Sequence, residues 1–161
     1  NAPVTASGAT WAPNTITYSG NNRTHMIRVP GPGRFELRLM DGATNPYLLQ
    51  AGILAAGIDG LERKRNPGKP INVNMYSDGH KVKGAKKLPL TLEKALSHLN
   101  KSKVLKDAFS KETINSYIKL KNKEIKKYNS SGIKKIGFKG SKQSNKKSII
   151  TQWEKDNTLD C

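Results

Sequence analysis

The sequence predicts an α+β fold in which antiparallel strands precede a series of helices. Three observations predict this class. Two short stretches with strand-like alternation, residues 23–29 and 34–39, flank the turn formers Pro30-Gly31-Pro32-Gly33. Residues 46–63 form one long apolar segment, and from residue 91 onward apolar side chains recur at helical spacing.

The first 20 residues are rich in Thr, Ser, Ala, Asn and Pro without a helical period, so we expect extended chain and turns there. The two following strands should pair antiparallel, because their connection is so short. Side chains alternate along the second strand, which predicts one face for a core and one charged face. The apolar face would hold Phe35, Leu37 and Leu39, and the charged face Arg34, Glu36 and Arg38.

A helix from Pro46 to about Arg63 is predicted, with Asn45 as its N-cap. It is apolar nearly all round, which is typical of a helix buried in a larger body. Its small residues would let another backbone come close; they are Gly52, Ala55, Ala56 and Gly57. Residues 66–88 are expected to form a loop, with at most a short strand at 71–75.

Three hydroxyl residues are expected to cap the later helices. Thr91 begins a helix with Leu92, Ala95, Leu96 and Leu99 on one side, Ser102 begins a short segment through Phe109, and Ser110 begins a longer helix to about Tyr128. The low-complexity residues 129–150 are predicted to be a loosely held linker or insertion, and residues 151–161 a more ordered tail.

The composition bounds the class of protein. The first 60 residues hold four arginines and three acidic residues, so the net charge of +17 lies almost wholly in a lysine-rich remainder. Few arginines or aromatics accompany those lysines, which favours a solvated surface over nucleic acid or an anionic membrane. No apolar run is long enough to span a membrane. A single cysteine, Cys161, predicts a reducing cytoplasm.

Two further patterns are rejected as sites. Gly132 and Gly137 have the glycine spacing of a phosphate loop, but Phe138-Lys139 follows instead of Lys-Ser/Thr. The three histidines, His25, His80 and His98, lack metal-ligand spacing and are interpreted as surface or hydrogen-bonded residues. The chain does not start with Met, which predicts a processed protein or a piece of a longer one.

The charged face of the predicted hairpin allows two interpretations. Spacing alone favours a solvated, cross-paired surface. The functional alternative is that Arg23, Arg28 and Arg38 hold an anionic group while Glu36 holds a hard metal ion beside it, as phosphoryl transfer requires. Because Arg23 and Arg28 would face opposite sides of a regular strand, this alternative requires Arg23 to lie in a turn before the strand.

Five short stretches occur in an order that resembles one enzyme family. They are Asn22-Arg23, Ile27-Arg28-Val29-Pro30, Arg34-Phe35-Glu36-Leu37-Arg38, Asn45-Pro46-Tyr47 and Ala56-Gly57-Ile58-Asp59-Gly60. Together they resemble the C-terminal part of the glutamine synthetase catalytic domain, across residues 11–128 and 151–161, and so assign residues 1–128 to that domain. The ending "TQWEKDNTLDC" is similar to the branch called type III or GlnT-like.

The resemblance implies an ATP-dependent glutamate–ammonia ligase of nitrogen assimilation, which makes glutamine through a γ-glutamyl phosphate and uses Mg²⁺ or Mn²⁺. Arg23 matches the family arginine that touches glutamate and nucleotide phosphate, and Arg28 the one on the ATP phosphates. Glu36 matches a metal-binding glutamate. Arg38 matches the arginine on the glutamate side-chain carboxylate and its acyl phosphate, so Arg23 and Arg38 are the expected catalytic residues.

Departures from the family pattern limit what the resemblance implies. Pro30-Gly31-Pro32-Gly33 replaces a longer segment that often carries a lysine for ATP. Tyr76 falls near a tyrosine that is adenylylated in some bacterial members, but its surroundings are basic and unlike theirs, so this regulation is not carried over. Residues 129–150 have no recognised counterpart.

The family's other metal ligands and its N-terminal domain would lie upstream of Asn1. We therefore expect a fragment of a longer enzyme that forms a homo-oligomeric ring. Its strands would be the edge of an incomplete sheet, and the fragment alone should be inactive and poorly soluble. Two alternatives stay open: another carboxylate–amine (γ-glutamyl) ligase of the same fold, and a Lys-rich nucleic-acid-binding module over residues 80–150.

Overall fold

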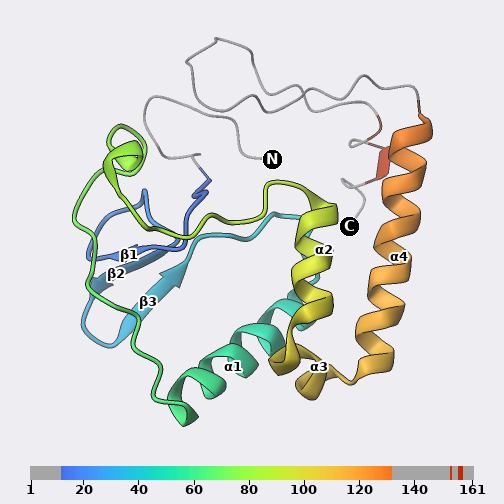
Figure 1. The fold of residues 1–161 in the computed structure, drawn as a ribbon, viewed down its shortest axis with the longest axis horizontal. Coiled ribbons are helices and arrows are strands. Elements are labelled where there is room, and N and C mark those ends of the chain that lie inside the picture. Colours follow the sequence, from blue (N-terminus) through green and yellow to red (C-terminus); the bar gives the residue numbers. More distant parts are fainter. Residues whose placement is uncertain (1–11, 132–152, 154–155, 158–161) are drawn as a thin grey trace. The chain divides into compact units, whose positions relative to one another are not determined.

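A computed structural model describes residues 12–131, 153 and 156–157 of the chain (Figure 1). These residues fall into two compact units. One unit contains residues 12–42 and 67–88, and the other contains residues 43–66, 89–131 and the described C-terminal positions. The predicted α+β composition is confirmed, since strands occupy the first unit and α-helices the second.

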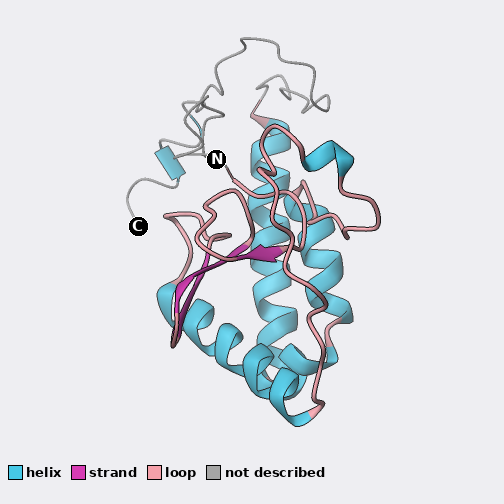
Figure 2. Cartoon of the chain, turned by 90° about the vertical axis from the view of Figure 1, so that its left-hand side faces the viewer, coloured by secondary structure: helices cyan, strands magenta, loops and turns pink. Residues whose placement is uncertain are grey.

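The first unit is built on a small sheet in the order β1-β2-β3 (Figure 2). Its strands are β1 (Tyr18–Ser19), β2 (Ile27–Gly31) and β3 (Arg34–Leu37). The predicted hairpin is confirmed, because β2 and β3 pair antiparallel. A register irregularity between Arg28 and Gly31 accommodates Pro30, which has no N–H for a regular ladder. Gly33 closes the turn at φ 79°, a conformation that glycine adopts without strain.

Two details of this unit differ from the sequence prediction. The first strand of the hairpin begins at Ile27 rather than residue 23, because Asn22 Oδ1 accepts hydrogen bonds from the backbone N and Oγ1 of Thr24 and turns the chain. Strand β1 was not predicted. The predicted loop over 66–88 is confirmed and holds no strand at 71–75: Asn74 Oδ1 accepts from Tyr76 N at 2.9 Å, and a short 3₁₀ helix, η1 (Gly79–Lys81), follows.

Residues 67–88 are nevertheless held firmly to the segment that leads into the sheet. Backbone hydrogen bonds join Ile16 N to Lys86 O at 2.8 Å, Leu88 N to Asn14 O at 2.9 Å and Ile71 N to Tyr18 O at 3.0 Å. Met75 from this segment is 5% exposed and forms apolar core, while His25 is completely buried. The loop is therefore anchored to the unit by Met75 and these backbone hydrogen bonds, although most of its residues are exposed, and it can position the residues of the sheet.

The second unit consists of four α-helices: α1 (Pro46–Glu62), α2 (Leu92–Lys101), α3 (Lys103–Phe109) and α4 (Lys111–Ser130). All four predicted N-caps are confirmed, because the side chains of Asn45, Thr91, Ser102 and Ser110 accept from backbone N–H groups three residues ahead. Helices α2 and α4 lie side by side in Figure 1, with Leu96 and Ile114 buried. Helix α1 packs on α3.

Helix α1, predicted to be buried inside a larger body, is exposed in this chain. None of its residues is buried, and Leu54 and Leu61 are 65% and 80% exposed. Helix α3 covers only the side near Gly52, where Leu105 and Phe109 lie 3.9 Å from the position of an added Cβ. A helix that is apolar all round has more surface than one short neighbour can cover. The predicted core face of β3 is open too, with Phe35 61% exposed.

The predicted linker and tail fall mostly outside the described residues. Helix α4 extends to Ser130, so its last turn enters the segment assigned to the linker. Farther on, the ring of Trp153 meets that of Tyr128 edge-on, with the centroids 5.2 Å apart. A search of the helices in the described part of the chain finds none with the length and apolar character of a membrane span.

Candidate active site

The hairpin brings Arg28 and Glu36 into direct contact. They are register partners in β2 and β3, and Nη1 of Arg28 donates to Oε1 and Oε2 of Glu36 at 2.7 and 2.8 Å. Arg34, which shares the face of Glu36, is more distant at 3.9 Å and largely exposed. The charged face is therefore cross-paired, as the simpler interpretation predicted, but only one of its pairs is tight.

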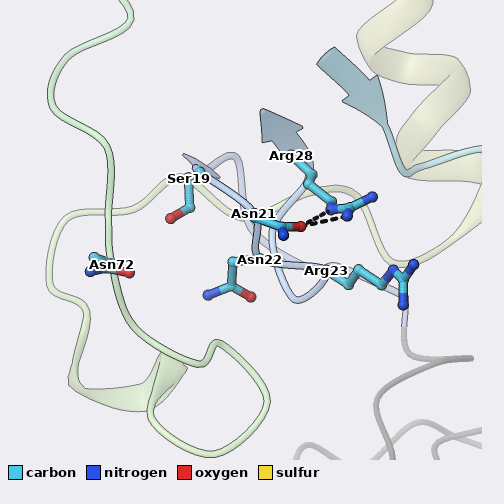
Figure 3. A pocket seen from close by; sticks show the side chains of 7 residues that line it. Ser19, Asn21, Asn22, Arg23, Arg28 and Asn72 are labelled. Atoms are coloured by element: carbon cyan, nitrogen blue, oxygen red, sulfur yellow. Dashed lines mark hydrogen bonds between the residues drawn. The ribbon is translucent and has the colours of Figure 1, made fainter. Parts of the chain in front are cut away.

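Arg23 lies in the turn before β2, where the functional interpretation required it. Together with Arg28 it lines an open cavity of about 580 Å³. The other lining residues are Ser19, Gly20, Asn21, Asn22 and Asn72. In the view of Figure 3, Arg23 and Arg28 extend in the same direction, away from Asn72. The cavity walls are thus amides, a hydroxyl and two guanidinium groups, which suits a polar anionic ligand.

Arg38 follows β3 and is fixed by its backbone N, which donates to Met26 O at 2.8 Å. Its Nη1 is buried and finds no hydrogen-bond partner among the described residues. Burial lowers the pKa of Arg38, while Glu36 opposes this effect and the charges of Arg23 and Arg28 add to it. A desolvated guanidinium with an unused donor is costly unless an anion binds it.

Glu36 is the one predicted metal ligand. Its pKa is held below the ordinary value, first by the hydrogen bond from Arg28 and then by the positive charges of Arg28, Arg34 and Arg23. The carboxylate is therefore ionised near neutral pH and fits a hard cation such as Mg²⁺. Within the described ranges, no three His, Cys, Asp or Glu side chains cluster, so these residues supply one ligand and not a complete metal site.

A network of buried and half-buried hydrogen bonds joins the Arg23 turn to the loop at Val73–Met75. His25 lies 3.0 Å from Thr17 Oγ1 through Nδ1 and 3.0 Å from Val73 O through Nε2. Asn22 Nδ2 also donates to Val73 O, and Met75 N donates to Thr24 Oγ1. Because a carbonyl only accepts, Nε2 of His25 carries the proton and Nδ1 can accept from Thr17.

Sequence reasoning interpreted His25 as a surface or hydrogen-bonded residue, and the second option is confirmed. It missed the partners, because Val73 lies 48 residues away and contributes only a carbonyl. Asn21 was missed as well: its Oδ1 accepts from Nε of Arg28 at 2.9 Å and also from Nη2 (Figure 3). No pattern in the sequence marks a single amide as the partner of one arginine.

The hairpin thus combines a partly buried arginine, two further arginines at a polar cavity and an ionised carboxylate. That combination is typical of enzymes that transfer phosphoryl groups with a metal ion. The chain belongs to the glutamine synthetase family, since residues 7–138 match the model of the glutamine synthetase catalytic domain. This confirms the resemblance seen in the ordered motifs.

Relatives and solved structures agree with this family. The chain is 51% identical over 160 residues to a glutamine synthetase of Rhizobium meliloti (strain 1021), which covers 99% of this chain and 33% of that protein. It is 43% identical over 125 residues to a glutamate–methylamine ligase of Methyloversatilis universalis, covering 76% of this chain and 28% of the relative. A solved GmaS/ADP complex matches with a TM-score of 0.73 and 46% identity, covering 100% of this chain and 33% of that one.

The chain therefore spans about a third of the length of the first relatives. The fold agrees with the expectation of part of a glutamine synthetase catalytic domain, because three strands and four α-helices superpose on the corresponding part of the GmaS structure. The exposed faces of α1 and β3 are thus seen in a chain that spans only part of its relatives' length.

Proposed function

We propose that the full-length protein is an ATP-dependent glutamate–ammonia ligase. The observation that supports it best is the Arg38 guanidinium. It is partly buried, its Nη1 is buried without a hydrogen-bond partner among the described residues, and the charges of Glu36, Arg23 and Arg28 act on it. Phosphoryl transfer to a carboxylate gathers negative charge on one group of oxygens, and arginines fixed in advance stabilise that charge. Family membership supplies the reaction class.

Each arginine then has a distinct role. Arg28 and Arg23, at the polar cavity, bind the phosphates of ATP, and Arg23 also reaches the glutamate substrate. Arg38 binds the side-chain carboxylate of glutamate and stabilises it when it is phosphorylated. Phosphorylation converts a poor leaving oxygen into a good one, so that ammonia can displace it. The similar GmaS structure is an ADP complex, which supports nucleotide binding by the full-length protein.

Glu36 contributes one carboxylate ligand to a divalent cation, Mg²⁺ or Mn²⁺. The cation would neutralise phosphate oxygens and orient them for transfer. Its remaining ligands would come from parts of the protein that lie outside the described residues. A cation on the Glu36 carboxylate would weaken its hydrogen bonds to Arg28 and make this guanidinium more available for phosphate.

A second candidate acceptor is methylamine, favoured by the 43% identity to a glutamate–methylamine ligase and by the match to GmaS. The residues assigned above bind ATP, glutamate and metal, and so do not separate the two amines. The experiment that separates them is a steady-state assay of the full-length protein with glutamate, Mg²⁺ and ATP. We expect higher kcat/KM with ammonia; higher kcat/KM with methylamine would establish the other γ-glutamyl ligase.

The proposal includes the wider setting of the enzyme. We infer a homo-oligomeric ring in the cytoplasm, where the single cysteine remains reduced. Membership of the type III or GlnT-like branch remains a prediction. So do the domain boundaries, with a catalytic part at 1–128, an insertion at 129–150 and a tail at 151–161. The nucleic-acid-binding alternative concerns the lysines of residues 80–150 and not the arginine cluster, and we interpret the lysines of α4 as a solvated surface.

A further inference from the structure

Asn21 holds one edge of the Arg28 guanidinium. Its Oδ1 accepts hydrogen bonds from Nε, at 2.9 Å, and from Nη2, while Nη1 on the opposite side is bound to Glu36. The side chain of Arg28 is only 11% exposed, although Asn21 itself lies at the surface. Both residues line the same cavity (Figure 3). The plane of the guanidinium is therefore fixed from two directions.

We infer that Asn21 is a positioning residue for nucleotide binding: it orients Arg28 toward the phosphates without neutralising its charge. This inference rests on the proposed function. Asn21 directly precedes the Asn22-Arg23 pair, and the proposed function assigns it no role. The chemical reason lies in the type of acceptor: a carboxylate at this position would cancel the positive charge of Arg28, whereas a carboxamide oxygen orients the fork and leaves the charge for an anion.

The role of Asn21 grows when Glu36 is engaged elsewhere. In the ligand-free protein, Glu36 alone could hold Arg28 through two short hydrogen bonds. Once the Glu36 carboxylate coordinates a cation, that support is weakened, and Asn21 is the remaining partner of Arg28 in the described structure. An arginine with a fixed fork loses less side-chain entropy when it binds phosphate.

The test uses the full-length enzyme carrying Asn21→Ala. We expect the KM for ATP to rise about fivefold to tenfold, the range for loss of a hydrogen bond to a charged group. The KM for glutamate should stay within about twofold, because Arg38 is unchanged. Asn21→Ser, whose shorter side chain does not reach Arg28, should give the same result. Asn14→Ala is the matched control, since Asn14 is an exposed asparagine of the same unit that does not line the cavity.

A double-mutant cycle with Arg28→Ala separates positioning from direct contact. If Asn21 acts through Arg28, adding Asn21→Ala to Arg28→Ala causes no further rise in the KM for ATP. Additive effects would overturn the inference, because they would mean that Asn21 contacts the nucleotide itself. An unchanged KM for ATP in Asn21→Ala, with a raised one in Arg28→Ala, would overturn the inference alone. An unchanged KM in Arg28→Ala would overturn the proposed phosphate site as well.

Discussion

Arg28 and Glu36 lie opposite each other in the antiparallel pair β2–β3, and a single nitrogen of Arg28 donates to both carboxylate oxygens at 2.7 and 2.8 Å. The proposed phosphate ligand and the proposed metal ligand thus neutralise each other when neither substrate nor cation is bound. We expect binding of a cation or a phosphate to weaken the pair, because each competes for a group that the pair now occupies.

Glu36→Gln tests the metal role of this pair. The amide keeps the size of the side chain and an oxygen acceptor for Arg28 but has no negative charge for a cation. We expect the Mg²⁺ concentration for half-maximal activity of the full-length enzyme to rise at least about tenfold, the expected order for loss of a charged ligand. The titration is done at saturating glutamate and ammonia and at a fixed concentration of free ATP. A Mg²⁺ requirement equal to that of the wild type would contradict the assignment.

Arg38→Lys tests whether the shape of the cation matters and not only its charge. Lysine keeps the positive charge but lacks the planar fork that binds two oxygens at once. We expect kcat to fall about 100-fold, as for loss of one oriented donor to a transition-state oxyanion, with a smaller change in the KM for ATP. The outcome that counts against this role is a kcat within about threefold of the wild type.

His25 predicts a pH dependence of stability. Burial lowers its pKa below the ordinary value of 6.5, and the hydrogen bond to Val73 opposes this effect only in part. The unfolded chain therefore takes up a proton at a higher pH than the folded protein does, and stability is lost as pH falls below about 6.5. His25→Gln retains an amide that can donate to Val73 but does not titrate.

The measurement is thermal unfolding of the full-length protein between about pH 8 and pH 5.5, the range that spans the ordinary histidine pKa. We expect the wild type to lose more of its Tm over this range than His25→Gln does. Parallel curves for the two proteins would show that His25 does not contribute to the pH dependence.

The exposed surface of helix α1 predicts that the isolated 161-residue chain associates with itself. Its exposed leucines and isoleucine form an apolar surface that favours association. The double substitution Leu54→Glu and Ile58→Glu, at positions 65% and 52% exposed, should lower light scattering of the purified chain at equal concentration. Lys119→Gln combined with Lys123→Gln on α4, which lowers the net charge by the same amount, is a charge-matched control that should not. Equal scattering from all three proteins would place the association elsewhere.

The hairpin and the helix starts could be predicted because their determinants are local. Asn45, Thr91, Ser102 and Ser110 each bind a backbone N–H three residues ahead, so both partners lie in one short window of sequence. The same holds for alternation in β3 and the glycine turn before it. The turn position of Arg23 was only a condition of the functional interpretation, because the predicted strand began at residue 23.

The rest depends on contacts that sequence patterns do not encode. Strand β1 has two residues and pairs parallel with β2, so neither length nor turn chemistry reveals it. His25 bonds to the carbonyl of Val73, which lies 48 residues away in the sequence. The apolar pattern of α1 predicts that the helix packs against other elements. Its exposure depends on how much of the full-length protein surrounds it.

Glutamine formation by the full-length protein carrying Glu36→Ala or Arg38→Ala tests the proposed site most directly. With ATP, Mg²⁺, glutamate and ammonia supplied, we expect each variant to lose at least about 100-fold in kcat/KM while retaining the thermal stability of the wild type, because each removes a group that stabilises transferred charge. Wild-type rates of ATP- and ammonia-dependent glutamine formation in both variants would contradict the assignment of this hairpin as one wall of the active site.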